Sequence, residues 1–181
     1  MAKIYESITE ELHDWMLEQK IYFTGTAAET GRVNVSPKGM DTFKILGPNK
    51  VAWLNLTGSG NETAAHLKLV NRITIMFCAF EGKPKILRLY GSAETIHQQD
   101  DKWNEYIGLF KEIRGARNIY VVDVDSLQTS CGFAVPLMDY KEDRQILGEW
   151  AEKKEESIGM KEYWEKKNTE SIDGFPTGIF D

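Results

Sequence analysis

The sequence predicts an α+β fold that is mainly β: a closed antiparallel barrel with helices on its outside. Runs of alternating or continuous apolar residues are separated by short turn signals, as in antiparallel hairpins, and only a few helical patterns interrupt them. A doubly wound parallel sheet is excluded, because it needs regular alternation of strand and helix. The length fits one domain over residues 1–138, with a C-terminal helical extension and tail over residues 139–181 packed on the same domain.

The first half of the chain predicts a helix, four strands and a second helix. Ser7 and Glu10 have the spacing of a capping box, so the first helix is expected over about residues 8–19. Pro37 is expected to end the alternating pattern of the second strand. The four strands are expected over residues 21–27, 32–36, 43–46 and 51–56, and the second helix over residues 64–69.

The second half predicts three strands, a helix between the last two, and a helical C-terminal region. Gly91 lies inside an otherwise apolar strand, which indicates a bulge or a close approach of two backbones. From Asp139 onward the chain is charged and helical, with Ile146, Leu147 and Trp150 as one apolar stripe. The strands are expected over residues 72–80, 85–96 and 118–124, and the helix over residues 100–113.

Composition excludes several classes of function. The formal net charge of −6 argues against broad contact with nucleic acid or with an anionic membrane. No segment approaches the roughly 20 apolar residues of a membrane span. The N-terminus has no apolar signal core, so we expect a cytoplasmic protein. The two cysteines form neither a metal pattern nor a disulfide framework.

The histidines predict no metal site. His66 lies four residues after Glu62 on one helical face, but a metal site would need a further ligand and the sequence offers none. His97 is expected at the surface.

A glycine-rich turn, TGSGNET over residues 57–63, joins an apolar strand to an amphipathic helix. The first N–H groups of a helix have no intrahelical partner and carry partial positive charge, so such a turn favours a phosphate. It is neither a P-loop nor a dinucleotide fingerprint, because the Gly-Lys-Ser/Thr ending and the glycine spacing are absent. A purely structural interpretation is equally open, since Ser59 and Glu62 have capping-box spacing.

Two further features place polar groups on strands. The segment VNVSPKG, residues 33–39, brings the hydroxyl of Ser36 and the cation of Lys38 to a sheet edge, although taken by itself it better fits a surface lysine after a turn. Arg88 lies in the middle of the apolar strand ILRLYG, where a charge either faces solvent or is paired inside a pocket.

These segments resemble the pyridoxamine 5′-phosphate oxidase-like family of flavin-binding split barrels. The resemblance covers roughly residues 4–127 and is carried by NVSPKG, GSGNET and ILRLYGSAE in that order, with a C-terminal SIDG tail. It is closest to a branch other than the true oxidase. It implies a split β-barrel, a homodimer, and FMN as the cofactor in a groove between the two barrels.

The resemblance also implies the site residues. The strand that bears Ser36 and Lys38 would run along the flavin ring, and Lys38 matches a lysine that in the oxidase sits beside the ring and the substrate, which makes it the catalytic candidate. Arg88 would point inward, towards the ring. The complete set of implied cofactor-binding residues is Asn34, Val35, Ser36, Lys38, Asn55, Thr57, Ser59, Asn61, Glu62, Thr63 and Arg88.

The chain departs from the true oxidase. The oxidase has an Arg-Lys pair where this chain has Glu62 and Thr63, and its substrate-phosphate residues and C-terminal arginine motif have no match here. We therefore expect no oxidation of pyridoxamine phosphate.

Several functions remain open. One is an FMN-dependent oxidoreductase acting on an unidentified small molecule, and another is a non-catalytic flavin-binding carrier or sensor. The others are a relative that binds a deazaflavin or haem, and an empty barrel used for protein contacts.

Overall fold

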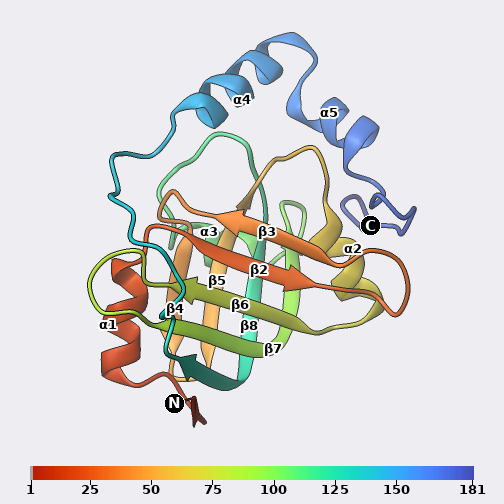
Figure 1. Ribbon diagram of the computed structural model, residues 1–181. Helices are drawn as coiled ribbons and strands as arrows, with labels where there is room; N and C mark the ends of the chain where they lie inside the picture. The colour runs from red at the N-terminus through yellow and green to blue at the C-terminus, as the bar shows by residue number, and fades with distance from the viewer. Residues whose placement is uncertain (1) are drawn as a thin grey trace.

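The computed structural model describes residues 2–181, in which an eight-stranded sheet curls into a barrel with five helices around it (Figure 1). The strands are β1 (Lys3–Tyr5), β2 (Tyr22–Thr26), β3 (Asn34–Lys38), β4 (Phe43–Gly47), β5 (Lys50–Leu56), β6 (Ile73–Cys78), β7 (Ile86–His97) and β8 (Ala116–Ser130). The helices are α1 (Glu10–Glu18), α2 (Glu62–Leu69), α3 (Trp103–Ile107), α4 (Ile146–Ser157) and α5 (Met160–Lys167).

The sheet is antiparallel throughout and open at one seam. The strand order is β3-β2-β6-β7-β8-β5-β4, and β1 pairs with the C-terminal end of β8. Within residues 2–181 no pairing joins the two edge strands, β3 and β4, so the barrel is split. The predicted α+β class with an antiparallel split barrel is confirmed, whereas full closure of the barrel by hydrogen bonds is not observed.

The core fills the inside of the barrel. Trp53 of β5 and Tyr120 of β8 are fully buried, and their stacked rings have centroids 4.4 Å apart. A second apolar cluster, which includes Leu54 and Ile119, lies on the opposite face of the same two strands, against the α3 region. Because β5 and the first half of β8 are covered on both faces, the runs Val51–Leu54 and Ile119–Val122 are continuously apolar.

Strands β7 and β8 come unusually close at Gly91. Their register shifts between Tyr90 and Gly91, so the predicted bulge is confirmed. A Cβ atom on Gly91 would lie 2.0 Å from the main-chain oxygen of Asp123. No side chain fits at that distance, and the barrel therefore requires glycine here.

Two sequence-based predictions near the N-terminus were wrong. Helix α1 begins at Glu10 because Thr9, not Ser7, is its N-cap, and the Thr9 hydroxyl accepts a hydrogen bond from the Leu12 N–H at 3.3 Å. Strand β3 continues through Pro37 to Lys38. It tolerates proline because it is an edge strand.

Four predictions in the second half also need correction. Helix α3 spans only Trp103–Ile107, while β8 is longer than expected and ends at Ser130. Residues 139–145 are not helical, so the C-terminal helices begin at Ile146. His97 is buried rather than exposed.

The C-terminal segment reaches back to the barrel. After α4 and α5 it passes beside α2 (Figure 1). The indole N–H of Trp164 in α5 donates to the Thr57 hydroxyl at 2.9 Å, and the Lys68 ammonium of α2 pairs with Asp181. In the part of the chain that the structure describes, no helix combines the length and apolar character needed to cross a membrane.

Replacing Gly91 by alanine is expected to destabilise the protein by about 2–3 kcal/mol or more, because the added methyl group would overlap the β8 backbone. The matched control is Gly148→Ala in α4, where a Cβ would meet nothing within 4 Å and alanine should be neutral or slightly stabilising. Urea unfolding midpoints measure both effects. Equal midpoints for the two variants would contradict the close approach at Gly91.

Candidate functional site

The inner face of β3 carries polar side chains. In the antiparallel register Asn34 lies opposite Thr26, and Lys38 lies opposite the buried Tyr22. Directly paired residues share one face of a sheet, so Asn34, Ser36 and Lys38 point into the barrel with the core side of β2. Alternation along NVSPK produces this arrangement, since every second residue of a strand faces the same way.

The first cluster joins β3 to the start of α2. The Asn34 amide donates to the Thr26 hydroxyl at 3.3 Å and to the Thr63 hydroxyl at 3.2 Å. Ser36 donates to the Asn34 carboxamide oxygen at 3.0 Å. Thr26 also lies 3.1 Å from Nδ1 of the buried His66. The structure therefore brings together three of the residues predicted from the sequence, Asn34, Ser36 and Thr63.

The second cluster joins β3 to β5 and β8. The Lys38 ammonium donates to Oδ1 of Asn55 at 3.1 Å, and Nδ2 of Asn55 donates to Oδ1 of Asn118 at 2.9 Å. The Arg117 guanidinium donates to the same Asn118 oxygen at 3.4 Å. Two cations thus flank a pair of asparagines at the end of the barrel core.

Neither cation has an acidic partner. Within residues 2–181 the ion pairs include neither Lys38 nor Arg117. Burial, and secondarily the positive charge of Arg117, lower the pKa of Lys38 to about 8. Burial lowers the pKa of Arg117 to about 10, so it remains a cation at neutral pH. Buried positive charge without a counter-ion suits an anionic ligand.

The glycine-rich turn is engaged by the C-terminal segment. Asn61 is buried and its amide donates to the main-chain oxygen of Asn168 at 3.5 Å. The Glu62 carboxylate accepts from the Ile172 N–H at 3.0 Å. Ser59 is exposed. The structural alternative of a capping box between Ser59 and Glu62 is not observed: α2 begins at Glu62, and its N-cap, Asn61, makes no side-chain capping bond.

The Thr57 hydroxyl is also occupied within the protein. It donates to the Gly115 carbonyl at 2.8 Å and accepts the Trp164 indole N–H. Thr57 therefore serves the packing of the turn against α5.

Two of the predicted residues lie on the outside of the barrel. Val35 is 65% exposed. Arg88 pairs in register with Met76 and Gln128, on the face opposite the buried Leu87 and Leu89, and donates to the Ser130 hydroxyl at 3.3 Å. The structure thus differs from the expectation that Arg88 points inward, and does not join it to the two clusters.

A cavity of about 1390 Å³ opens beside Lys38. It lies between α1, the turns after β3 and β6, and residues 138–150, which include Tyr140 and Trp150. Ligand sites commonly measure roughly 300–1,000 Å³, so the space exceeds what one small molecule needs. No histidine lines it among the described residues.

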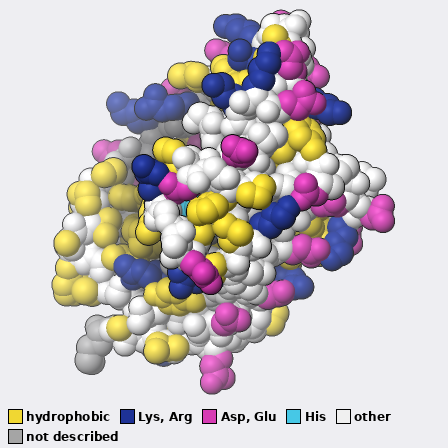
Figure 2. All heavy atoms as spheres, turned by 90° about the vertical axis from the view of Figure 1, so that its right-hand side faces the viewer, with side chains coloured by type: hydrophobic (Ala, Val, Ile, Leu, Met, Phe, Trp, Pro, Cys, Tyr) yellow, Lys and Arg dark blue, Asp and Glu magenta, His cyan; other side chains and the backbone are white. Residues whose placement is uncertain are grey.

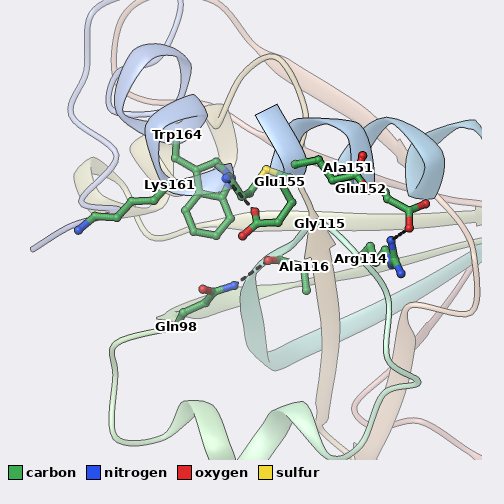
Figure 3. Close-up of a pocket in the computed structure, with 11 residues that line it drawn as sticks. Gln98, Arg114, Gly115, Ala116, Ala151, Glu152, Glu155, Lys161 and Trp164 are labelled. Atoms are coloured by element: carbon green, nitrogen blue, oxygen red, sulfur yellow. Dashed lines mark hydrogen bonds and ion pairs between the residues drawn. The ribbon is translucent and has the colours of Figure 1, made fainter. Parts of the chain in front are cut away.

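A smaller cavity of about 610 Å³ lies between the C-terminal helices and the barrel (Figure 3). Its charged groups have opposite signs, and Arg114 is already paired with Glu152. Figure 3 shows the Gln98 side chain at its lower side, bonded to the main-chain oxygen of Ala116 at 2.8 Å. It contains none of the residues predicted from the sequence.

Sequence reasoning missed several members of the polar network. Arg117 and Asn118 lie near the start of β8, directly before the apolar run Ile119–Val122, and this pair of polar residues was the available signal. Asn168 lies in a charged, irregular part of the chain and gave no signal. His66 was considered only as a metal ligand.

Comparison with known proteins agrees with this architecture. A family model described as pyridoxamine 5′-phosphate oxidase matches residues 8–131. The pyridoxamine 5′-phosphate oxidase family protein ustO of Aspergillus flavus is 38% identical over 193 residues, which cover 97% of this chain and 78% of that protein.

Solved structures show the same fold at low identity. A variant of HupZ from Group A Streptococcus superposes with a TM-score of 0.55 at 16% identity, over 68% of this chain and 99% of that chain. A candidate pyridoxamine 5′-phosphate oxidase of Lactobacillus delbrueckii gives a TM-score of 0.53 at 17% identity, over 68% and 94% of the two chains. Together with the family match, these findings show that the chain belongs to the pyridoxamine 5′-phosphate oxidase family and has its split-barrel fold.

Proposed function

We propose that the protein binds FMN and acts as a flavin-dependent oxidoreductase on a small molecule. The observation that carries the proposal is the pair of cations, Lys38 and Arg117, which lie at the end of the barrel without a carboxylate partner among the described residues. FMN is an anion through its phosphate, and it has a polar ribityl chain that hydroxyl and carboxamide groups can bind.

Buried polar atoms without partners support the fit to such a ligand. In residues 2–181 these atoms include Nδ2 of Asn118, Nε2 of His66 and Oδ1 of Asn61. Since unpaired buried polar groups are costly, their presence around one network favours a polar molecule that completes it.

The residues of the first cluster and Lys38 would hold the cofactor. Asn34, Ser36 and Thr63 offer hydroxyl and amide groups, and Lys38 offers a cation beside the larger cavity. When bound, the flavin supplies the electron and hydride chemistry, while the protein binds and orients it. A positive charge from Lys38 near the ring would stabilise negative charge that develops there.

The alternatives differ in what they require. A carrier or sensor needs the same binding site without turnover, and a deazaflavin would use similar contacts. Haem binding commonly relies on a histidine ligand. The absence of histidine from the described lining of the larger cavity favours flavin over haem.

We further propose that a second copy of the chain completes the site. Val33 just before β3, Val35 on the outer face of β3 and Ile4 of β1 are each at least 65% exposed. Figure 2 shows hydrophobic side chains gathered along its left margin, the side on which Figure 1 displays β2, β3, β6 and β7. Arg88 belongs to this face, so it would reach a flavin only across a two-fold interface.

FMN is expected to bind at one molecule per chain, with a perturbed flavin absorption band. Equilibrium dialysis against FMN, haem and a deazaflavin, followed by mass spectrometry of the released molecule, measures this preference. Reduction of bound FMN by NADH or NADPH with continued turnover would support an enzyme, whereas binding without turnover would support a carrier. Failure to take up FMN at micromolar concentration would refute the assignment.

The affinity for FMN is expected to fall as the pH rises through about 8, where unliganded Lys38 loses its proton. An anion favours the protonated lysine, so binding takes up a proton above this pH. Lys38→Met should weaken binding at pH 7 by roughly tenfold or more and remove the pH dependence between pH 7 and 9. The control is Lys50→Met, since Lys50 forms an exposed ion pair with Asp123.

The free energy of unfolding of the unliganded protein should rise with pH in the range where the affinity for FMN falls. The pKa of Lys38 is lower in the folded state than in the unfolded chain, so the unfolded chain binds more protons above pH 8. The contribution of Lys38 to the free energy of unfolding therefore rises with pH from about 8 towards its ordinary pKa.

A pH-independent FMN affinity in the unsubstituted protein would contradict the role of Lys38 in binding.

Analytical ultracentrifugation is expected to show a dimer at micromolar concentration. Val35→Lys should shift the equilibrium towards monomer and lower FMN affinity, because it places a charge on the proposed interface. Leu17→Lys is the matched control, since Leu17 is 52% exposed on α1 and does not line the larger cavity. A monomeric protein that still binds FMN would remove the second copy from the site.

A further inference from the structure

Asn168 connects the C-terminal segment to the glycine-rich turn at several points. It is completely buried. Its side-chain oxygen accepts from Arg117 at 2.8 Å, and its amide donates to the Gly58 carbonyl at 3.2 Å. Its main-chain oxygen accepts from the Thr177 hydroxyl at 2.6 Å and from the Asn61 amide. One residue therefore links the turn, β8 and the C-terminal tail.

Arg117 holds the same turn at a second carbonyl. Its guanidinium donates to the Gly60 carbonyl at 2.9 Å as well as to Asn168 and Asn118. All three acceptors are neutral, and the side chain is only 4% exposed. A guanidinium keeps its proton in proteins, so these oxygens must stay in place to satisfy the buried charge.

The two cations also fix the order of donors and acceptors between them. Arg117 is a donor only, so Asn118 must present its oxygen. Asn55 must then offer its amide to that oxygen, which leaves the Asn55 oxygen for Lys38. The orientation of the Lys38 partner is thus set by Arg117 through two asparagines.

We propose that Arg117 and Asn168 are positioning residues of the flavin site: they hold the glycine-rich turn and, through Asn118 and Asn55, direct the Lys38 ammonium. This inference rests on the proposed function in so far as the positioned groups serve the cofactor. It makes the C-terminal tail an integral part of the site, although none of the motifs predicted from the sequence lies there.

The tail would act on the pKa of Lys38 through the charge of Arg117, to which Asn168 is hydrogen-bonded. The group that acts on Lys38 through space is Arg117 of β8, and Tyr22 of β2 lies directly opposite Lys38 with its phenol bonded to Thr42 at 3.0 Å. Other charged residues line the larger cavity with Lys38 and form no ion pair with it. They are Glu18, Lys20, Glu81, Lys83, Lys85, Asp139, Glu142, Asp143 and Arg144.

The first test is Asn168→Asp in flavin-free protein, with the titration of Lys38 followed by NMR of ¹³C-labelled lysine. A carboxylate beside Arg117 offsets its charge, so the Lys38 midpoint is expected to rise from about 8 towards its ordinary value. The matched control is Asn104→Asp, the same change at an exposed position of α3. A midpoint unchanged by Asn168→Asp in folded protein would overturn the link to Lys38.

The second test is Asn168→Ala, which removes both side-chain bonds without adding charge. The amide hydrogens of residues 58–62 are expected to exchange faster, and the FMN dissociation constant to rise roughly tenfold. Unchanged exchange would overturn the holding of the turn. If Lys38 and the turn respond as expected while the unsubstituted protein binds no FMN, the positioning stands and the proposed function fails.

Discussion

Burial of the Arg117 guanidinium is the interaction on which the polar end of the barrel depends. The group keeps its charge at neutral pH, so its hydrogen bonds must be supplied by the protein. The acceptors come from the turn after β5, from β8 itself and from the tail, which are far apart in the sequence. These three segments are therefore constrained together by one side chain, and the candidate site inherits its shape from that constraint.

The same two strands build both the core and the site. Trp53 lies opposite Tyr120 in the register of β5 and β8, and two residues further on Asn55 lies opposite Asn118. The aromatic pair is stacked and fully buried, while the amide pair connects two cations. The tightly packed aromatic pair next to the amide pair keeps the two amides in place, which is what a binding site requires.

Much of the fold was readable from the sequence because hydrophobic periodicity and turn residues are local signals. Gly91 is an example, since a glycine inside an apolar strand indicates a bulge or a close backbone approach, and both occur there. Asn34, Ser36 and Lys38 were found through a motif, and strand alternation places them on one face.

Arg117 and Asn168 were missed because their pairing is tertiary, and no spacing rule joins a strand start to an irregular tail. Arg88 shows the opposite error. A charge inside an apolar strand marks the residue as unusual, but the local pattern does not say which face of the strand it occupies.

Pro37 has a consequence for how the molecule meets others. It lies within β3, an edge of the sheet, and it lacks the N–H group that an incoming strand would use. An exposed edge is otherwise a template on which another chain extends the sheet, a common route to aggregation. With that row of donors interrupted, association through the edge is disfavoured, and copies that meet at β3 are directed to pack face to face.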